Sequence, residues 1–457
     1  MALSSLFIMG NSHAQLPLEI FWGTDQYIHS TSTNQLNHRQ NYLRYQIHHE
    51  QIWQAKKPHS NDRIKYQQQT LSLVISPDIS KHANITLQLS QHYTSFIASQ
   101  QTTDWHGEAR HANNNPQAGV LIQARYAFVG LFYNQQEQMA EIGLRFNSKN
   151  SVFIKHKNTQ SQWRNDFELN PNTPDEYYKI KFPLHTDIRL FGGGWTFSHN
   201  TLSLNSEALL SEHRTNHSQS HKLNWQLSIG HRLEFQTEHF QYAADNQAIS
   251  IDKKIQGRWN AINQYQANTL AWTIDSNTAA HQFYLKHNQW QLDLEGNYNA
   301  RALVNHWASI LVGGGRFKFS QHTQFVAVGI NSTNPTRQPK GRLWAYGIAL
   351  GQLKFTSDGG HIVDQYPIGT LLNTPLTFGD RKIDVALLSI TTGYRWPQFE
   401  WRYRYAQIVP LREDNDESDQ AKPSSNQRKQ ASPSNWAEHL KRLPDGSRHT
   451  LEIRYLF

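Results

Sequence analysis

Apolar and charged residues alternate along the last part of the chain, residues 451–457. The apolar positions are Leu451, Ile453, Tyr455 and Phe457, and the charged positions between them are Glu452 and Arg454. A period of two is typical of a β-strand that has one apolar and one polar face. The pattern predicts a strand that runs to the C-terminal aromatic residue. A soluble sheet ending on Phe is the alternative interpretation, and the rest of the chain has to decide between the two.

A second stretch, residues 399–405, shows the same alternation with aromatic residues. One face carries Phe399, Trp401, Tyr403 and Tyr405, and the other carries Glu400, Arg402 and Arg404. The inner face of a soluble sandwich is mainly aliphatic, whereas an aromatic face opposite a charged one fits lipid on one side and a water-filled lumen on the other. Soluble carbohydrate-binding sheets also carry aromatic rows. The membrane interpretation is favoured by the pattern, and the soluble one stays open.

Short strand-like runs recur along the chain from residue 70, each bounded by Asn, Gly, Pro, Ser or Asp. No stretch approaches the roughly 20 apolar residues that a membrane-spanning helix needs. The connections alternate in length: 198–200 and 396–398 are short, whereas 98–118, 155–179, 356–381 and 411–448 are long. The chain is therefore predicted to be all-β, a single antiparallel transmembrane β-barrel of about 16–18 strands, with its longest extracellular loop near 411–448.

The N-terminal end carries a candidate export signal. A short apolar run precedes Ser12 and Ala14, which resemble an A-x-A-like cleavage site. This predicts a signal peptide over residues 1–14 and a mature barrel over 15–457. No Lys or Arg precedes the run, so either the signal begins further upstream or the segment is not a signal. The absence of cysteine from the chain suits an envelope protein.

Catalytic and cofactor motifs are not apparent in the sequence. There is no nucleophile elbow, His-Glu-x-x-His pair or phosphate loop, and the 25 histidines show no ligand spacing, so we expect no catalytic residues, metal or cofactor. The net charge of +8 could suit nucleic acid, but no binding module accompanies it and export argues against it. In a barrel, this charge fits an anionic solute or an acidic polysaccharide near the lumen.

The charges of the last two predicted strands are candidate lumen residues. Glu400, Arg402 and Arg404 are expected to face Glu452 and Arg454 across the final hairpin. These side chains then either pair with one another and fix the strand register, or bias the passage of ions. Both interpretations remain open.

The C-terminal pattern resembles the closing strand of Gram-negative outer-membrane β-barrels. The resemblance implies location in the outer membrane, contact with its lipid, and recognition of the terminal strand by the barrel-assembly machinery. The residues that carry this assembly signal are Leu451, Ile453, Tyr455 and Phe457.

A second, local resemblance involves residues 359–380. Gly360, Tyr366, Pro367 and Gly369, followed by Asp380 and a strand, are similar to the late segment of capsule-assembly (Wzi-type) barrels. The chain lacks the helical N-terminal segment and the Trp-Trp-Gly-Pro-Gly-like loop of that family. The resemblance implies a barrel that holds surface polysaccharide. The functional expectation is a non-enzymatic, porin-like barrel that passes or retains a polar, anionic solute or glycan. A polysaccharide anchor is the alternative, and an outer-membrane hydrolase is the third class.

Overall fold

The structure is a computed structural model of the whole chain. It describes residues 42–54, 63–76, 78–80, 83–101, 106–134, 137–147, 150–169, 178–212, 216–251, 255–276, 279–299, 315–334, 340–363, 374–375, 381–415 and 446–456. The predicted signal peptide lies outside the described residues. No helix in the described part of the chain is long and apolar enough to cross a membrane.

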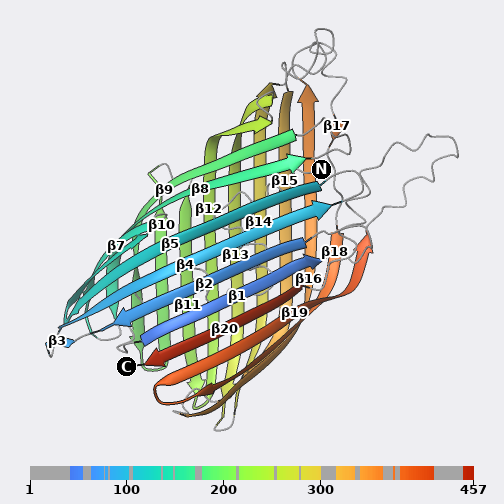
Figure 1. Cartoon of the computed structure of the whole chain (residues 1–457). Helices are drawn as coiled ribbons and strands as arrows, with labels where there is room; N and C mark the ends of the chain where they lie inside the picture. The colour runs from blue at the N-terminus through green and yellow to red at the C-terminus, as the bar shows by residue number, and fades with distance from the viewer. Residues whose placement is uncertain are drawn as a thin grey trace, which may run out of the picture.

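Twenty strands in the described residues form one antiparallel sheet (Figure 1). Their bounds are β1 Tyr42–Gln54, β2 Arg63–Ile75, β3 Asp78–Ser80, β4 Ala83–Gln101, β5 His106–Ala124, β6 Ala127–Asn134, β7 Glu137–Arg145, β8 Ser151–Leu169, β9 Tyr178–His199, β10 Leu202–Leu210, β11 His217–Ser228, β12 His231–Ile251, β13 Ile255–Asp275, β14 Ala280–Asn299, β15 Gly315–Thr333, β16 Gly341–Val363, β17 Thr374–Pro375, β18 Arg381–Arg395, β19 Phe399–Asn415 and β20 Gly446–Leu456.

Each wall strand pairs with its neighbours in the sequence, and the sheet closes where β1 pairs with β20. The three-residue β3 and the two-residue β17 pair only with β4 and β16, so eighteen strands build the wall. The predicted antiparallel barrel is confirmed, and the strand count falls at the upper end of the predicted range. Closure leaves no unpaired sheet edge, which is what a β-structure in lipid requires.

Several connections predicted as long loops are instead largely strand. Residues 98–118 and 155–179 belong mostly to the pairs β4–β5 and β8–β9, and the connections between them are only residues 102–105 and 170–177. Similarly, β16 extends to Val363, β19 extends to Asn415 and β20 starts at Gly446. The predictions of long loops over 98–118 and 155–179 were wrong because the strands continue beyond the stretch in which apolar residues alternate with polar ones.

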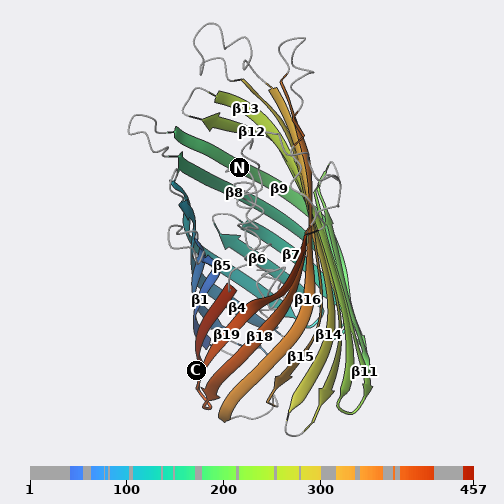
Figure 2. The same ribbon diagram turned by 90° about the vertical axis from the view of Figure 1, so that its right-hand side faces the viewer.

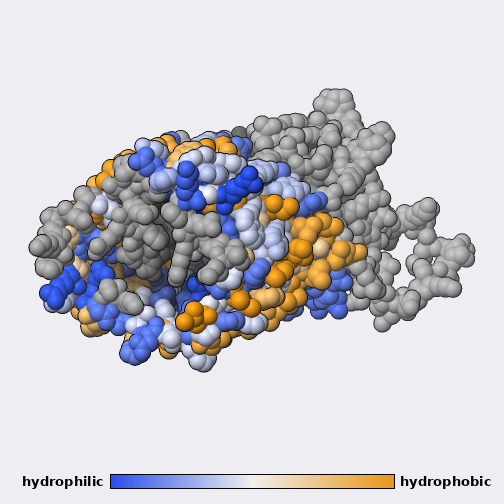
Figure 3. All heavy atoms as spheres, turned by 90° about the horizontal axis from the view of Figure 1, so that it is seen from below, coloured by the Kyte–Doolittle hydropathy of each residue, from blue (hydrophilic) through white to orange (hydrophobic). Residues whose placement is uncertain are grey.

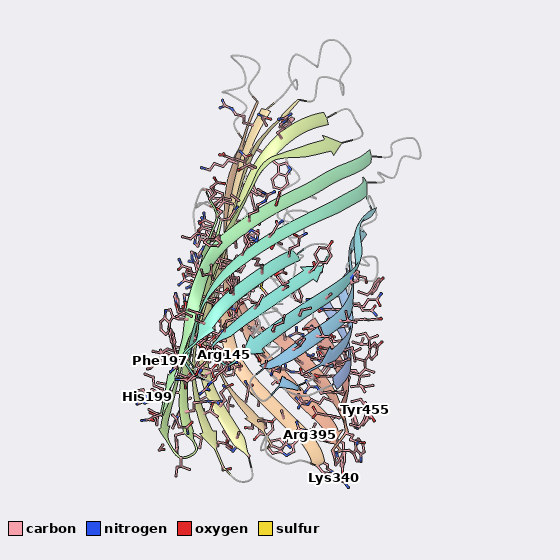
Figure 4. All side chains as sticks on the ribbon, turned by 90° about the vertical axis from the view of Figure 1, so that its left-hand side faces the viewer. Arg145, Phe197, His199, Lys340, Arg395 and Tyr455 are labelled. Atoms are coloured by element: carbon pink, nitrogen blue, oxygen red, sulfur yellow. The ribbon has the colours of Figure 1, made fainter. Side chains whose placement is uncertain are left out.

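Short turns close the end of the barrel at which β20 finishes. They include residues 125–126, 200–201, 229–230 and 396–398. Asn200 adopts a positive φ of 46° in the turn between β9 and β10, a conformation that Asn tolerates better than most residues. The labelled residues Arg145, Phe197, Arg395 and Tyr455 all lie toward this end (Figure 4). In an outer-membrane barrel, the end with short turns faces the periplasm.

The outer face of the wall carries a belt of exposed apolar side chains near the short turns. On β16 the belt consists of Trp344, Tyr346, Ile348 and Leu350. Seen from below, hydrophobic side chains gather in patches on the outside of the wall (Figure 3). Exposed apolar residues that alternate with inward-facing ones are the lipid-facing surface of a transmembrane barrel.

Farther from the short turns, apolar side chains lie on the inner face of the wall and polar side chains lie on the outer face. Several long strands, including β12 and β13, extend to the end of the barrel opposite the short turns (Figure 2). On these strands the apolar side chains lie on the inner face, and each of the following is at most 4% exposed: Tyr265, Trp290, Leu292, Phe325, Leu353 and Val385. The outer face at the same height is polar. This part of the wall is therefore built like a sheet surrounded by a hydrated medium.

Candidate functional site in the lumen

One wall of the lumen, formed by β18, β19, β20 and β1, is rich in arginine. The strand register aligns the inward-facing positions of these four strands in rows. The first row contains Arg395, Glu400, Arg454 and Arg44, the second contains Arg402, Glu452 and Gln46, and the third contains Arg404, Thr450 and His48. Five arginines and two glutamates in these rows give a surplus of three positive charges. In the next row of the register, Arg448 of β20 is aligned with residue Glu50 of β1.

Each of the two glutamates in the first three rows lies between two arginines. Glu400 is 2.5 Å from both Arg395 Nε and Arg402 Nε. Glu452 Oε1 is 3.1 Å from Arg44 Nε and 3.4 Å from Arg454. The sharing of carboxylates leaves net positive charge on this arginine wall. The exposed fraction of these ion-paired side chains ranges from 9% for Glu400 to 41% for Arg402.

A second wall, formed by β7, β8 and β10–β12, pairs its charges one against another. Lys157 lies 3.1 Å from Glu137, and Lys222 lies 2.7 Å from Glu234. Lys155 contacts Glu207 and lies 3.5 Å from Glu141. The inward-facing charges here are five carboxylates and five cations: Glu137, Glu141, Glu207, Glu234, Glu238, Arg145, Lys155, Lys157, Lys222 and Arg232. This wall is balanced, and one further lysine, Lys286, lies inward on the nearby strand β14.

The two walls face each other across the barrel. β10 is nine wall strands from β20 in either direction around the sheet, so the centres of the two walls are diametrically opposite. Of the inward-facing charged residues named so far, only Lys286 of β14 belongs to neither wall. The lumen therefore lies between a positive wall and a neutral one.

The structure brings together the lumen residues predicted from the last two strands. In the register of β19 and β20, Glu400 is directly opposite Arg454 and Arg402 is directly opposite Glu452. Arg404 is the next inward-facing residue along β19. The assembly-signal positions Leu451, Ile453 and Tyr455 lie on the opposite, outer face, and Tyr455 is 45% exposed.

Only some of the other residues predicted from the sequence lie in the described part of the chain. Gly360 lies in β16, where it pairs with Lys318 of β15 and with Pro375 of β17. Phe457, Tyr366, Pro367, Gly369 and Asp380 lie outside the described residues. The structure therefore leaves the loop resemblance to the Wzi-type barrels as an expectation.

Sequence reasoning missed the balanced wall and two members of the arginine wall, Arg395 and Arg44. The partners Lys155 and Glu207 are 52 residues apart in the sequence, and only the strand register brings them together. A local signal does exist on β7, where the inward-facing Glu137, Glu141 and Arg145 alternate with outward-facing apolar residues. This is the pattern that identified β19.

No group of three or more His, Cys, Asp or Glu side chains is arranged to hold a metal ion within the described part of the chain. The polar groups of the two walls are cations, carboxylates and amides that already contact one another. Their arrangement suits electrostatic interaction with a passing solute.

No known family profile matches the sequence, and no curated protein sequence matches it. Solved structures resemble the fold over most of the chain. OccAB3 of Acinetobacter baumannii shares 10% identity over 92% of this chain and 98% of its own, with a TM-score of 0.42. OpdQ of Pseudomonas aeruginosa shares 8% identity over 92% and 97%, with a TM-score of 0.39. A bacterial polysaccharide outer membrane secretin shares 10% identity over 92% and 99%, with a TM-score of 0.34.

These similarities concern the fold alone. The architecture gives a physical argument for a membrane location, because the closed sheet pairs its backbone groups within the wall and presents a belt of apolar side chains on its outer face. The chain is a membrane-spanning antiparallel β-barrel of eighteen wall strands.

Proposed function

We propose that the barrel is a non-enzymatic channel that passes a polar, anionic solute through its lumen. The observation that carries the proposal is the surplus of three positive charges in the first three rows of the arginine wall, opposite a wall of balanced charge. Charges in a narrow lumen are screened less than charges on an open surface, so a surplus of one sign biases permeation. The proposed solute is therefore anionic.

The selectivity of the purified protein in planar bilayers tests this proposal. We expect a steady conductance that prefers anions. Replacing Arg402 and Arg404 with Gln removes two of the five cations and leaves the aromatic outer face unchanged. The reversal potential of this double variant should shift toward cations.

A control variant separates lumen charge from total charge. Arg258→Gln together with Arg342→Gln also removes two cations, but from outward-facing positions on β13 and β16. Its reversal potential should match that of the unmodified protein. If Arg402→Gln/Arg404→Gln assembles normally and its reversal potential does not move, the arginines act as structural partners of Glu400 and Glu452, and the selectivity proposal is wrong.

Retention of surface polysaccharide is the second candidate function. The observation that favours it is the dry inner face of the upper strands, where Tyr265, Leu292 and Leu353 are almost inaccessible to water. A wall of this kind fits a filled lumen better than an open one. A plugged anchor should be nearly silent in the bilayer and should bind acidic polysaccharide in a pull-down, whereas a channel should conduct.

A further inference from the structure

Twelve outward-facing side chains on β11, β12, β13 and β14 form a patch that is polar and carries no Asp, Glu, Lys or Arg. We call this patch the amide–imidazole grid. The register arranges it in three rows of four, which are His221–Thr237–Asn268–His287, Gln219–His239–Gln266–Gln289 and His217–Gln241–Gln264–Gln291.

The grid lies directly above the lipid-facing belt. Two apolar rows of the same four strands separate it from the short turns, and they are Trp225–Leu233–Trp272–Phe283 and Leu223–Phe235–Leu270–Leu285. Most of these eight side chains are exposed on the outer face. The grid therefore continues the membrane-facing surface upward at the level where the belt ends.

The inner face behind the grid is mixed. Phe240, Tyr265, Trp290 and Leu292 are buried there, and the polar Ser218, Ser220, Glu238 and Asn288 lie between them. The position of the grid relative to the lipid therefore follows from its own chemistry, because uncovered amides in hydrocarbon cost several kcal/mol. The outer face at this height consequently meets the hydrated layer just outside the hydrocarbon.

The chemistry of the grid selects among the groups in that layer. Amides and imidazoles both donate and accept hydrogen bonds, and neighbouring grid residues already do so. Gln264 Nε2 donates to Gln241 Oε1 at 2.8 Å, and His217 Nε2 lies 3.1 Å from His239 Nδ1. Phosphate recognition relies mainly on Arg and Lys, and the grid has neither. Ordinary water-exposed surfaces carry about 25–35% charged residues, which twelve uncharged neighbours do not resemble.

We propose that the amide–imidazole grid binds the neutral sugar residues of outer-leaflet glycolipid, whose hydroxyl groups also donate and accept hydrogen bonds. The grid would dock the barrel to the saccharide layer through its uncharged face. This inference goes beyond the proposed channel and does not depend on it, because the grid faces outward and the arginine wall faces the lumen.

Proteoliposomes of defined composition test the proposal. The probes are lipopolysaccharide with a complete core, deep-rough lipopolysaccharide that lacks the outer sugars, and phosphatidylglycerol alone. The readout is the temperature at which the barrel loses its folded mobility on gels. Complete-core lipopolysaccharide should raise this temperature by several degrees more than the deep-rough form. The increment should persist at high salt, because hydroxyl recognition involves no ion pair.

Variants identify the surface that is responsible. Gln266→Leu together with Gln289→Leu removes the centre of the grid and should abolish at least half of the increment. Gln69→Leu together with Gln91→Leu changes two outward-facing residues outside the grid, on β2 and β4, and should keep the increment.

Four results would overturn the proposal. The first is equal stabilisation by the complete-core and deep-rough forms. The second is a grid variant that keeps the full increment. The third is an increment that disappears at high salt, which would identify phosphate as the ligand. The fourth is a purified complex whose mass falls from oligomer to monomer in the grid variant without lipopolysaccharide, which would mean that a second copy of the chain covers the grid.

Discussion

The two charged walls of the lumen use similar residues in opposite ways. On the balanced wall each lysine has its own carboxylate, and Lys155 has two. On the arginine wall each glutamate serves two guanidinium groups. Burial sets one cluster of the balanced wall apart, because the side chains of Lys155 and Glu141 are only 5% and 3% exposed, whereas that of Arg402 is 41% exposed.

This difference separates stability from selectivity. A buried ion pair contributes to the barrel mainly through the cost of breaking it, since the remaining charge is left in a poorly hydrated site. A wet surplus of arginines contributes less to stability and more to the electrostatic potential of the lumen. Variants on the balanced wall should therefore affect folding, and variants on the arginine wall should affect ion passage.

The largest effect is expected from Lys155→Met. This change leaves Glu141 and Glu207 close together without their shared cation, and breaking such a buried pair costs about 3–5 kcal/mol. The midpoint of urea unfolding in detergent, followed by the heat-dependent shift on gels, should fall sharply. A triple variant that adds Glu141→Gln and Glu207→Gln should recover most of the loss. Unchanged unfolding of Lys155→Met would show that this ion-pair cluster does not stabilise the wall.

The next largest effect concerns assembly and leaves both walls intact. Replacing Tyr455 and Phe457 with Ser removes the aromatic side chains of the proposed assembly signal and part of the lipid-facing surface. The amount of assembled barrel in outer membranes should fall several-fold while the transcript level stays constant. Tyr133→Ser, at an equally outward-facing aromatic position on β6, is the matched control and should assemble normally. Equal membrane levels of all three proteins would contradict the assembly prediction.

The smallest effect is expected from Glu400→Gln. Removing the carboxylate that Arg395 and Arg402 share raises the surplus of the arginine wall by one charge. The reversal potential should move further toward anions, in the direction opposite to that of Arg402→Gln/Arg404→Gln, and by less because one charge changes instead of two. Glu295→Gln removes a carboxylate from the outer face of β14 and should leave the reversal potential unchanged. A shift of Glu400→Gln toward cations would refute the role of the surplus.

The sequence predicts the lower half of the barrel better than the upper half. On β19 the aromatic residues from Phe399 to Tyr405 all take the outer face, so the local pattern alone reveals the strand. Residues 106–116 of β5 contain no large apolar side chain and carry no such pattern, and only pairing with β4 shows that they are strand. Beyond the lipid, the apolar residues no longer mark the outer face. On β13 and β14 they lie on the inner face, and on the upper part of β5 large apolar residues are missing from the strand.

In the candidate site, too, the sequence predicts contacts between adjacent strands and misses contacts between distant parts of the chain. Arg402 and Glu452 were predictable because they lie on adjacent strands of the final hairpin. Arg44 joins their wall from the other end of the chain, through the pairing of β1 with β20 that closes the barrel. A contact of this kind depends on the register of the closed sheet, which no local sequence pattern contains.

The length of the strands also determines where a solute first meets the protein. β14 has 20 residues, and its lipid-facing apolar positions end at Leu285. The thirteen residues from 287 to 299, at about 3.3 Å per residue and a tilt of about 40°, raise the mouth roughly 33 Å above the belt. Electrostatic repulsion from anionic lipid headgroups decays over about 8 Å at physiological ionic strength. The mouth thus opens beyond most of that repulsion, and an anion can be captured there before it feels the charge of the bacterial surface.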